Sequence, residues 1–119
     1  MITVFLLAII LITGGYFRFL NLNWDESYHL HPDERYLSMV LNSLQPVENA
    51  REYFDTQNSS LNPNNHGFTF FVYGTFPLFL IRYVGEWIGQ IGYDPITLVG
   101  RHLSSFFDLF TVILVFLIG

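Results

Sequence analysis

The sequence predicts an all-α integral membrane protein. We expect a transmembrane helix, then an extracytoplasmic loop with amphipathic juxtamembrane helices, then the start of a second transmembrane helix. Two apolar runs lie near the ends of the 119-residue chain, with a polar stretch between them. Hydrophobic residues make up 51% of the chain and charged residues only 13%, against roughly 25% charged residues in an ordinary soluble domain.

Residues 1–20 are predicted to form the first transmembrane helix. The run from Ile2 to Phe17 is almost wholly apolar, and two apolar residues continue it past Arg18. About 20 such residues cross a bilayer core of ~30 Å, and a long Arg side chain can reach the polar interface from the end of the helix. A cleaved signal peptide is the alternative. No Lys or Arg precedes the run and no Ala-x-Ala-like site follows it, which favours an uncleaved anchor.

Residues 21–100 are predicted to form the first extracytoplasmic loop. Its first helix, at about 32–45, begins at Pro32, a residue favoured in the first helical turn. An apolar stripe with the spacing i, i+3, i+4, i+7 follows, and it consists of Leu37, Val40, Leu41 and Leu44. Because apolar segments flank this short amphipathic helix, we expect it to lie flat on the membrane.

The second juxtamembrane helix is expected at about 68–88. This segment is long enough to cross the membrane, but Pro77 interrupts it, and Arg82 and Glu86 lie four residues apart on one helical face. Charges at membrane depth cost roughly 2.5–3.5 kcal/mol each on insertion scales. An interfacial or re-entrant helix is therefore favoured, and a full span is the alternative.

Residues 101–119 are predicted to begin the second transmembrane helix. The apolar run continues to the last residue without a flanking charge, so the sequence is expected to be a fragment cut inside or just after a membrane helix. Asp108 lies within this run, and an ionisable residue inside a membrane helix suggests a functional role. The alternative is that Asp108 lies near enough to the surface to stay hydrated.

The stretch from Trp24 to Tyr36 holds many of the side chains that could take part in catalysis or ligand binding. It holds four of the ten acidic residues and two of the four histidines. Asp33 and Glu34 lie at the predicted helix start, where one carboxylate can accept a proton from an attacking hydroxyl and the other can orient a partner or a cation. The alternative is that both only complement the helix dipole.

Metal binding is a weaker hypothesis for the same stretch. His29 and His31, with Asp33, offer the imidazole and carboxylate ligands that suit zinc or manganese. However, side chains two residues apart converge only on an extended strand, and two loop histidines more often form ordinary hydrogen bonds or sense pH. We therefore assign no metal ligand, and whether the protein uses a divalent metal ion as a cofactor stays an open question.

Charge limits the classes of partner. The chain has no lysine and a formal net charge of −5, which argues against nucleic acid or an anionic lipid surface as the main partner. With no cysteine, the chain offers no disulfide and no thiolate ligand.

Four landmarks occur in order along the chain: the N-terminal apolar helix, Pro32-Asp33-Glu34-Arg35-Tyr36, Tyr73-Gly74-Thr75-Phe76-Pro77-Leu78-Phe79-Leu80, and Arg101-His102-Leu103-Ser104. This order resembles the start of a GT-C class membrane glycosyltransferase. It is most similar to the protein O-mannosyltransferase and aminoarabinose transferase group, glycosyltransferase family 39. The resemblance covers nearly the whole chain, and its best landmark is the Asp-Glu pair after the first membrane helix.

The resemblance implies an inverting transfer of sugar from a polyprenyl-phosphate donor to an acceptor hydroxyl at the extracytoplasmic face of the plasma or inner membrane. Asp33 is then the general base and Glu34 its supporting partner. Arg35, Tyr36, Arg101 and Asp108 are candidate substrate-binding residues. From the residues alone, Arg101 lies seven residues before Asp108 on the same helical face and either balances it or binds a donor phosphate. The resemblance also implies a multi-pass protein with residues 21–100 outside.

Two alternatives stay open. Asp25 and Glu26 form a second acidic pair in the same stretch, so the base could be Asp25 instead of Asp33. The other alternative is a non-catalytic small membrane subunit or anchor whose acidic loop binds a partner or a metal ion. In either case we expect the 119 residues alone to be inactive, since most of a donor pocket would be missing.

Overall fold

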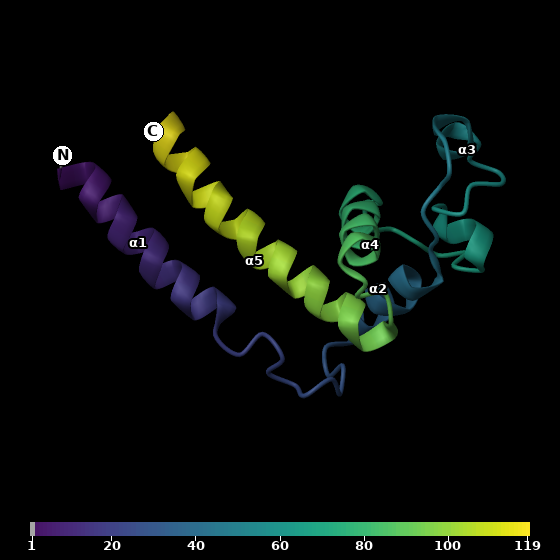
Figure 1. Cartoon of the computed structure of the whole chain (residues 1–119), viewed down its shortest axis with the longest axis horizontal. Coiled ribbons are helices and arrows are strands. Elements are labelled where there is room, and N and C mark those ends of the chain that lie inside the picture. Colours follow the sequence, from purple (N-terminus) through teal and green to yellow (C-terminus); the bar gives the residue numbers. More distant parts are fainter. Residues whose placement is uncertain (1) are drawn as a thin grey trace.

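The computed structural model describes residues 2–119, and in this range every regular element is a helix (Figure 1). The prediction of an all-helical chain is therefore confirmed for the part described. The elements are α1 (Ile2–Phe19), α2 (Pro32–Ser43), α3 (Ala50–Phe54), the 3-10 helix η1 (Pro63–His66), α4 (Phe76–Ile88) and α5 (Tyr93–Ile118).

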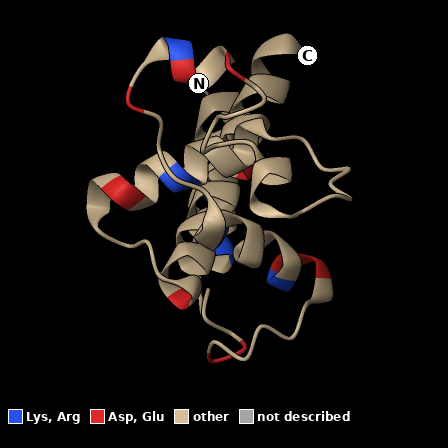
Figure 2. Ribbon diagram, turned by 90° about the vertical axis from the view of Figure 1, so that its right-hand side faces the viewer, with Lys and Arg blue, Asp and Glu red and all other residues tan. Residues whose placement is uncertain are grey.

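Helices α1 and α5 are both long and apolar enough to cross a membrane. They lie side by side and antiparallel, with the two chain termini at the same end (Figure 1). At 1.5 Å per residue, their 18 and 26 residues correspond to about 27 and 39 Å. Their apolar side chains face outward, with Ile12 73% and Val115 64% exposed, and most charged residues lie on the other elements (Figure 2).

The contact between α1 and α5 combines small residues with an ion pair. Leu109 of α5 lies 3.5 Å from the Cβ positions that side chains at Gly14 and Gly15 would occupy. One turn further along α1, the Arg18 guanidinium pairs with the Asp108 carboxylate. The 3.5 Å distances are ordinary van der Waals contacts, whereas a Cβ atom at Gly14 would lie 2.9 Å from Arg18 Nη1, so glycine at position 14 leaves room for the Arg18 side chain of this pair.

The core lies where α2 and α4 meet the N-terminal part of α5. Val40, Leu41, Leu44, Leu78 and Ile96 are buried there. The predicted apolar stripe of the first juxtamembrane helix therefore exists, but its central residues face α4 and α5. The expectation that this stripe lies on the membrane surface is wrong, because the two neighbouring helices cover it.

The starts of α4 and α5 differ from the predicted ones, and a proline or a glycine lies at each of these starts. The second juxtamembrane helix begins at Phe76 and not at about 68, because Pro77 occupies its first turn, the position that proline favours. Its 13 residues measure about 20 Å, too short to cross a bilayer core of ~30 Å. The last helix begins at Tyr93, eight residues before the predicted start, after its N-cap Gly92.

The turn between α4 and α5 depends on one glycine. A Cβ atom at Gly85 would lie 2.5 Å from Ile96 Cδ1 and 2.9 Å from the backbone oxygen of Gln90. Real Cβ atoms do not come this close, and the Gln90 contact is to backbone that closes the end of the helix through its N–H bond to the Gly85 carbonyl. Glycine at this position therefore permits the close approach of α4 and α5.

We accordingly expect Gly85→Ala to destabilise the chain by roughly 1–3 kcal/mol, the usual cost of forcing extra volume into a packed site. Denaturant unfolding followed by circular dichroism measures the change. Gly74→Ala is the matched control, since a Cβ atom there meets nothing within 4 Å. Equal stability of the two variants would contradict the close-packing explanation.

The polar segment between α2 and α4 is ordered by short caps. The side-chain oxygen of Asn49 accepts the Glu52 N–H at the start of α3, and that of Asn62 accepts the Asn64 N–H at the start of η1. The Glu52 carboxylate in turn accepts the Ser60 hydroxyl at 2.9 Å. These elements lie at the end of the molecule away from α1 (Figure 1).

Candidate functional site

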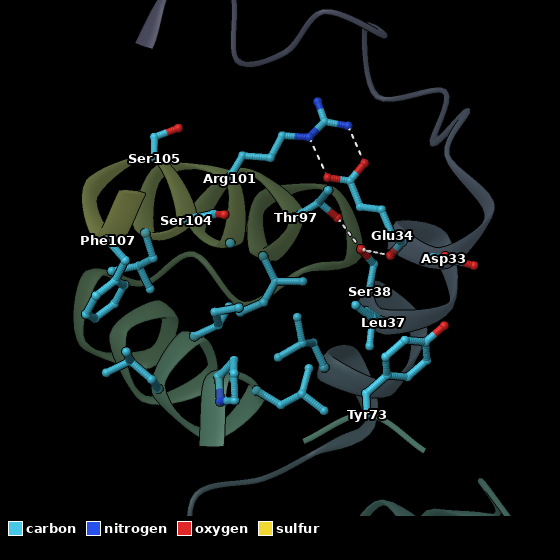
Figure 3. Close-up of a pocket in the computed structure, with 18 of the residues that line it drawn as sticks. Asp33, Glu34, Leu37, Ser38, Tyr73, Thr97, Arg101, Ser104, Ser105 and Phe107 are labelled. Carbon is cyan, nitrogen blue, oxygen red and sulfur yellow. Dashed lines mark hydrogen bonds and ion pairs between the residues drawn. The ribbon is translucent and has the colours of Figure 1, made fainter. Parts of the chain in front are cut away.

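One arginine joins three segments that are far apart in the sequence. Arg101 on α5 donates from Nε and Nη2 to the two carboxylate oxygens of Glu34 on α2, at 2.7 and 2.6 Å. It also donates from Nη1 and Nη2 to the two oxygens of Asp25, both at 2.9 Å. We call these three residues the Arg101 cluster. Figure 3 shows the Glu34 side of it, with the two parallel bonds that suit a planar guanidinium.

A tightly wound loop brings Asp25 to the cluster. The chain takes left-handed backbone conformations at Asn21, Glu26, Ser27 and His29, which fold residues 20–31 back on themselves. Asp25 Oδ2 accepts the Leu30 N–H at 3.3 Å, and the Asp25 side chain is 1% exposed. The ring of the preceding residue, Trp24, lies 5.6 Å from the guanidinium carbon of Arg101, within the range of a cation–π contact.

The Arg101 guanidinium has no N–H left for a ligand in this arrangement. Its remaining hydrogen bond goes from Nη1 to the Leu22 carbonyl at 2.7 Å, and a guanidinium has five N–H donors in all. Of the two alternatives for Arg101, the one in which it balances Asp108 is wrong, since Asp108 pairs with Arg18 of α1. Arg101 therefore holds the loop, α2 and α5 together.

The cluster lowers the pKa of Asp25. Hydrogen bonds from the Arg101 guanidinium are the main cause, and they outweigh the opposing effect of burial, so the pKa falls from 3.8 to about 2. A carboxyl whose pKa is lower in the folded state stabilises that state above its unfolded pKa and loses this contribution as the pH falls through the folded value.

We therefore expect the loop to loosen as the pH is lowered from about 4 to about 2, the interval between the two pKa values of Asp25. Trp24 emission reports on this, in a Trp87→Phe background that removes the second tryptophan. Asp25→Asn should abolish the transition in this interval, because an amide does not titrate there. A transition of unchanged size and midpoint in Asp25→Asn would show that Asp25 does not control it.

The two carboxylates of the proposed pair, Asp33 and Glu34, lie in different environments. Glu34 is held by Arg101, whereas Asp33 is exposed and accepts no hydrogen bond from residues 2–119. Figure 3 shows the Asp33 side chain directed away from Arg101. Of the two residues that follow, Arg35 is exposed, and the Tyr36 hydroxyl donates to the Phe70 carbonyl at 2.9 Å. Tyr36 thus ties α2 to the segment before α4.

The two candidate metal-binding histidines are directed to different partners. His29 is buried, and its Nε2 lies 2.7 Å from Asp94 Oδ1 at the start of α5. His31 caps α2, with its Nδ1 accepting the Glu34 N–H at 3.3 Å. In residues 2–119, no three His, Asp or Glu side chains come together in a way that could hold a metal ion.

A cavity of about 910 Å³ lies beside the Arg101 cluster, between α2, α4 and α5. Glu34 and Arg101 form part of its wall, and Asp33 lies at its edge. Its other lining residues are Leu22, Trp24, His31, Leu37, Ser38, Leu41, Tyr73, Gly74, Phe76, Pro77, Leu78, Leu80, Ile81, Ile96, Thr97, Gly100, Leu103, Ser104, Ser105 and Phe107. The volume falls within the roughly 300–1,000 Å³ of small-molecule sites.

Sequence reasoning did not identify Thr97, Gly100 and Ser104 as cavity residues. They lie on α5 at spacings of three and four, on the same helical face as Arg101. Thr97 also shares a buried hydrogen bond of 2.7 Å with Ser38 of α2. A row of small and polar residues within an apolar segment was the signal, and it extends further toward the N-terminus than the predicted helix start at residue 101.

Over residues 2–119, the fold and site together define a chain of helices with two helices long and apolar enough to cross a membrane, and with a charged cluster and a cavity where α2 and α4 meet α5. No protein-family model matches this chain, and comparison with the curated proteins and with the solved structures finds no match. Its function must therefore be argued from the site.

Proposed function

We propose that this chain forms the N-terminal part of a membrane glycosyltransferase that transfers a sugar from a polyprenyl-phosphate donor to an acceptor hydroxyl. The observation that carries the proposal is the division of the acidic pair beside a large cavity. Asp33 has no partner among residues 2–119 and lies at the cavity edge, while Glu34 is fixed by Arg101. A base needs an uncommitted carboxylate, and a supporting residue needs a fixed one.

In the proposed step, the acceptor oxygen attacks the anomeric carbon of the donor sugar. The bond between that carbon and the phosphate oxygen breaks, and polyprenyl phosphate leaves with the bonding electrons. The proton of the acceptor hydroxyl passes to the Asp33 carboxylate. Attack opposite the leaving group inverts the anomeric configuration.

The proposed placement has α1 and α5 in the bilayer of the plasma or inner membrane, as two helices of a multi-pass protein. The loop, α2 and α4 then lie on the extracytoplasmic face. The length of α1 supports this placement, because its 18 residues measure about 27 Å, close to the ~30 Å bilayer core. Arg18 and Asp108 pair near the end of α1, where charged groups can reach the polar interface.

Sugar transfer in membranes that contain the whole enzyme tests the proposal. A donor labelled in its sugar should give labelled product and free polyprenyl phosphate in equal amounts, and the product should have the inverted anomeric configuration. Membranes that lack the enzyme serve as the control. Absence of transfer across a panel of polyprenyl-phosphate sugars and hydroxyl acceptors would count against the transferase and favour a non-catalytic membrane subunit.

A further inference from the structure

We propose that the cavity between α2, α4 and α5 binds an amphiphile whose hydroxyl-bearing head carries no negative charge. In the proposed function, this amphiphile is the acceptor of the sugar. Only that identification rests on the proposed function; the binding itself does not. The donor phosphate is then bound outside the cavity.

The cavity has two chemically different ends. Asp33, Glu34 and Tyr73 lie at one side of it, and Phe107 lies at the opposite side, further along α5 (Figure 3). Leu103 of α5 and Leu80 of α4 also line the cavity. A ligand that fills the cavity therefore has a polar group at the end near α2 and an apolar group at the end near Phe107.

The cavity also lies at the height expected for a molecule held in the outer part of a bilayer. The apolar run of α1 ends at Arg18, beside Asp108 of α5. Arg101 is seven residues before Asp108, which corresponds to about 10 Å along a helix. The polar headgroup layer on each side of a bilayer measures roughly 5–8 Å. In this placement, the end of the cavity near Arg101 and α2 lies at or just above the lipid headgroups, and the end near Phe107 lies at the boundary of the apolar core.

Charge decides which kind of head is accepted. In residues 2–119, Arg101 is the only arginine or lysine among the residues that line the cavity. Its five N–H donors are all used by Asp25, Glu34 and Leu22. Two carboxylates on one guanidinium leave a net negative charge, and Asp33 adds to it, so a phosphate head would meet like charge without a donor to compensate it.

Hydroxyl groups, in contrast, have suitable partners. On the polar side of the cavity, the Tyr73 hydroxyl forms no hydrogen bond with residues 2–119, and the Asp33 carboxylate at the edge also accepts none. The Ser104 hydroxyl likewise forms none, and it lies nearer to Phe107 (Figure 3). These groups can accept from, or donate to, the hydroxyls of a sugar or an alcohol. A neutral or cationic hydroxylated head therefore fits where an anionic one does not.

Amphiphile binding to the 119-residue chain in lipid nanodiscs tests the proposal. The Trp87→Phe variant leaves Trp24, a lining residue, as the sole reporter. Octyl glucoside, octyl(2-hydroxyethyl)dimethylammonium and octyl phosphate are titrated below the concentrations that disrupt the nanodisc. We expect saturable changes in Trp24 emission with the first two, and binding of octyl phosphate weaker by about tenfold or more, as expected for uncompensated like charge.

Two substitutions on α5 distinguish binding of the amphiphile in the cavity from its general partitioning into the lipid of the nanodisc. Ser104→Phe places a ring in the cavity and should weaken octyl glucoside binding by about tenfold. Thr111→Phe adds the same ring seven residues further along, outside the cavity, and should leave binding unchanged. Asp33→Asn removes one carboxylate and should narrow the discrimination against octyl phosphate.

Equal or tighter binding of octyl phosphate would overturn the proposal, as would equal effects of the two Phe variants or the absence of any saturable signal. The outcome is independent of the transferase. Selective glucoside binding by a chain whose whole enzyme transfers no sugar would keep this site and discard the proposed function. Sugar transfer by a chain without selective binding would do the reverse.

Discussion

Replacing Arg101 with alanine is expected to lower the melting temperature of the chain by about 10 °C or more, because it leaves paired carboxylates without their counter-ion. The Arg101 side chain is only 9% exposed, and the Asp25 side chain it contacts is 1% exposed. The Leu22 carbonyl also loses its hydrogen bond. Thermal unfolding in detergent, followed by circular dichroism, measures the change.

Arg101→Lys separates charge from geometry in the same measurement. An ammonium group has three donors without the planar fork of a guanidinium, so it can replace only part of the five hydrogen bonds. We expect a melting temperature between those of the wild type and Arg101→Ala. If Arg101→Ala melts within 2 °C or so of the wild type, the cluster does not hold the three segments together.

The second large effect is on catalysis. If the whole protein is the proposed glycosyltransferase, Asp33→Asn is expected to lower its turnover by roughly 10²–10⁴, the contribution usual for a general base. Its melting temperature should stay that of the wild type, since Asp33 is exposed and has no hydrogen-bond partner among residues 2–119. Initial rates of sugar release at saturating donor, with protein amounts matched, measure this effect.

Asp33→Glu is the matched control, because it keeps the carboxylate and moves it by one methylene. It should retain more activity than Asp33→Asn. Glu34→Gln differs in kind, because Glu34 is bound to Arg101 through both oxygens. That variant should lose stability as well as turnover, whereas a loss confined to turnover would assign Glu34 a direct part in the reaction.

The helices could be predicted from the sequence because their signals are local. The apolar run of α1 and the stripe of α2 each act within a few residues. The effect of Pro77 is also local, but the prediction took it as an interruption, whereas it lies in the first turn of α4. What covers each face could not be predicted in this way. The stripe of α2 packs against α4 and α5, and no local pattern distinguishes a helical neighbour from a lipid surface as the apolar partner.

The candidate site was only partly predictable for the same reason. Asp33 and Glu34 could be singled out from their position at a helix start, but their different environments depend on an arginine 67 residues after Glu34. The pairing of Asp25 with Arg101 depends in turn on a loop with four left-handed residues. Such contacts are decided by tertiary packing, which residue spacing does not encode.

The role proposed for Asp33 is tested by comparing Asp33→Asn with Asp25→Asn in the proposed glycosyltransferase, by the rate of sugar transfer from a labelled polyprenyl-phosphate donor. We expect only Asp33→Asn to lose turnover at neutral pH when protein levels are matched. Asp25→Asn, which removes one partner of Arg101, should chiefly lower stability. Normal turnover in Asp33→Asn would show that Asp33 is not the base. With turnover lost only in Asp25→Asn, the base would lie in the other acidic pair, and with both variants active the acidic loop would not be the catalytic site.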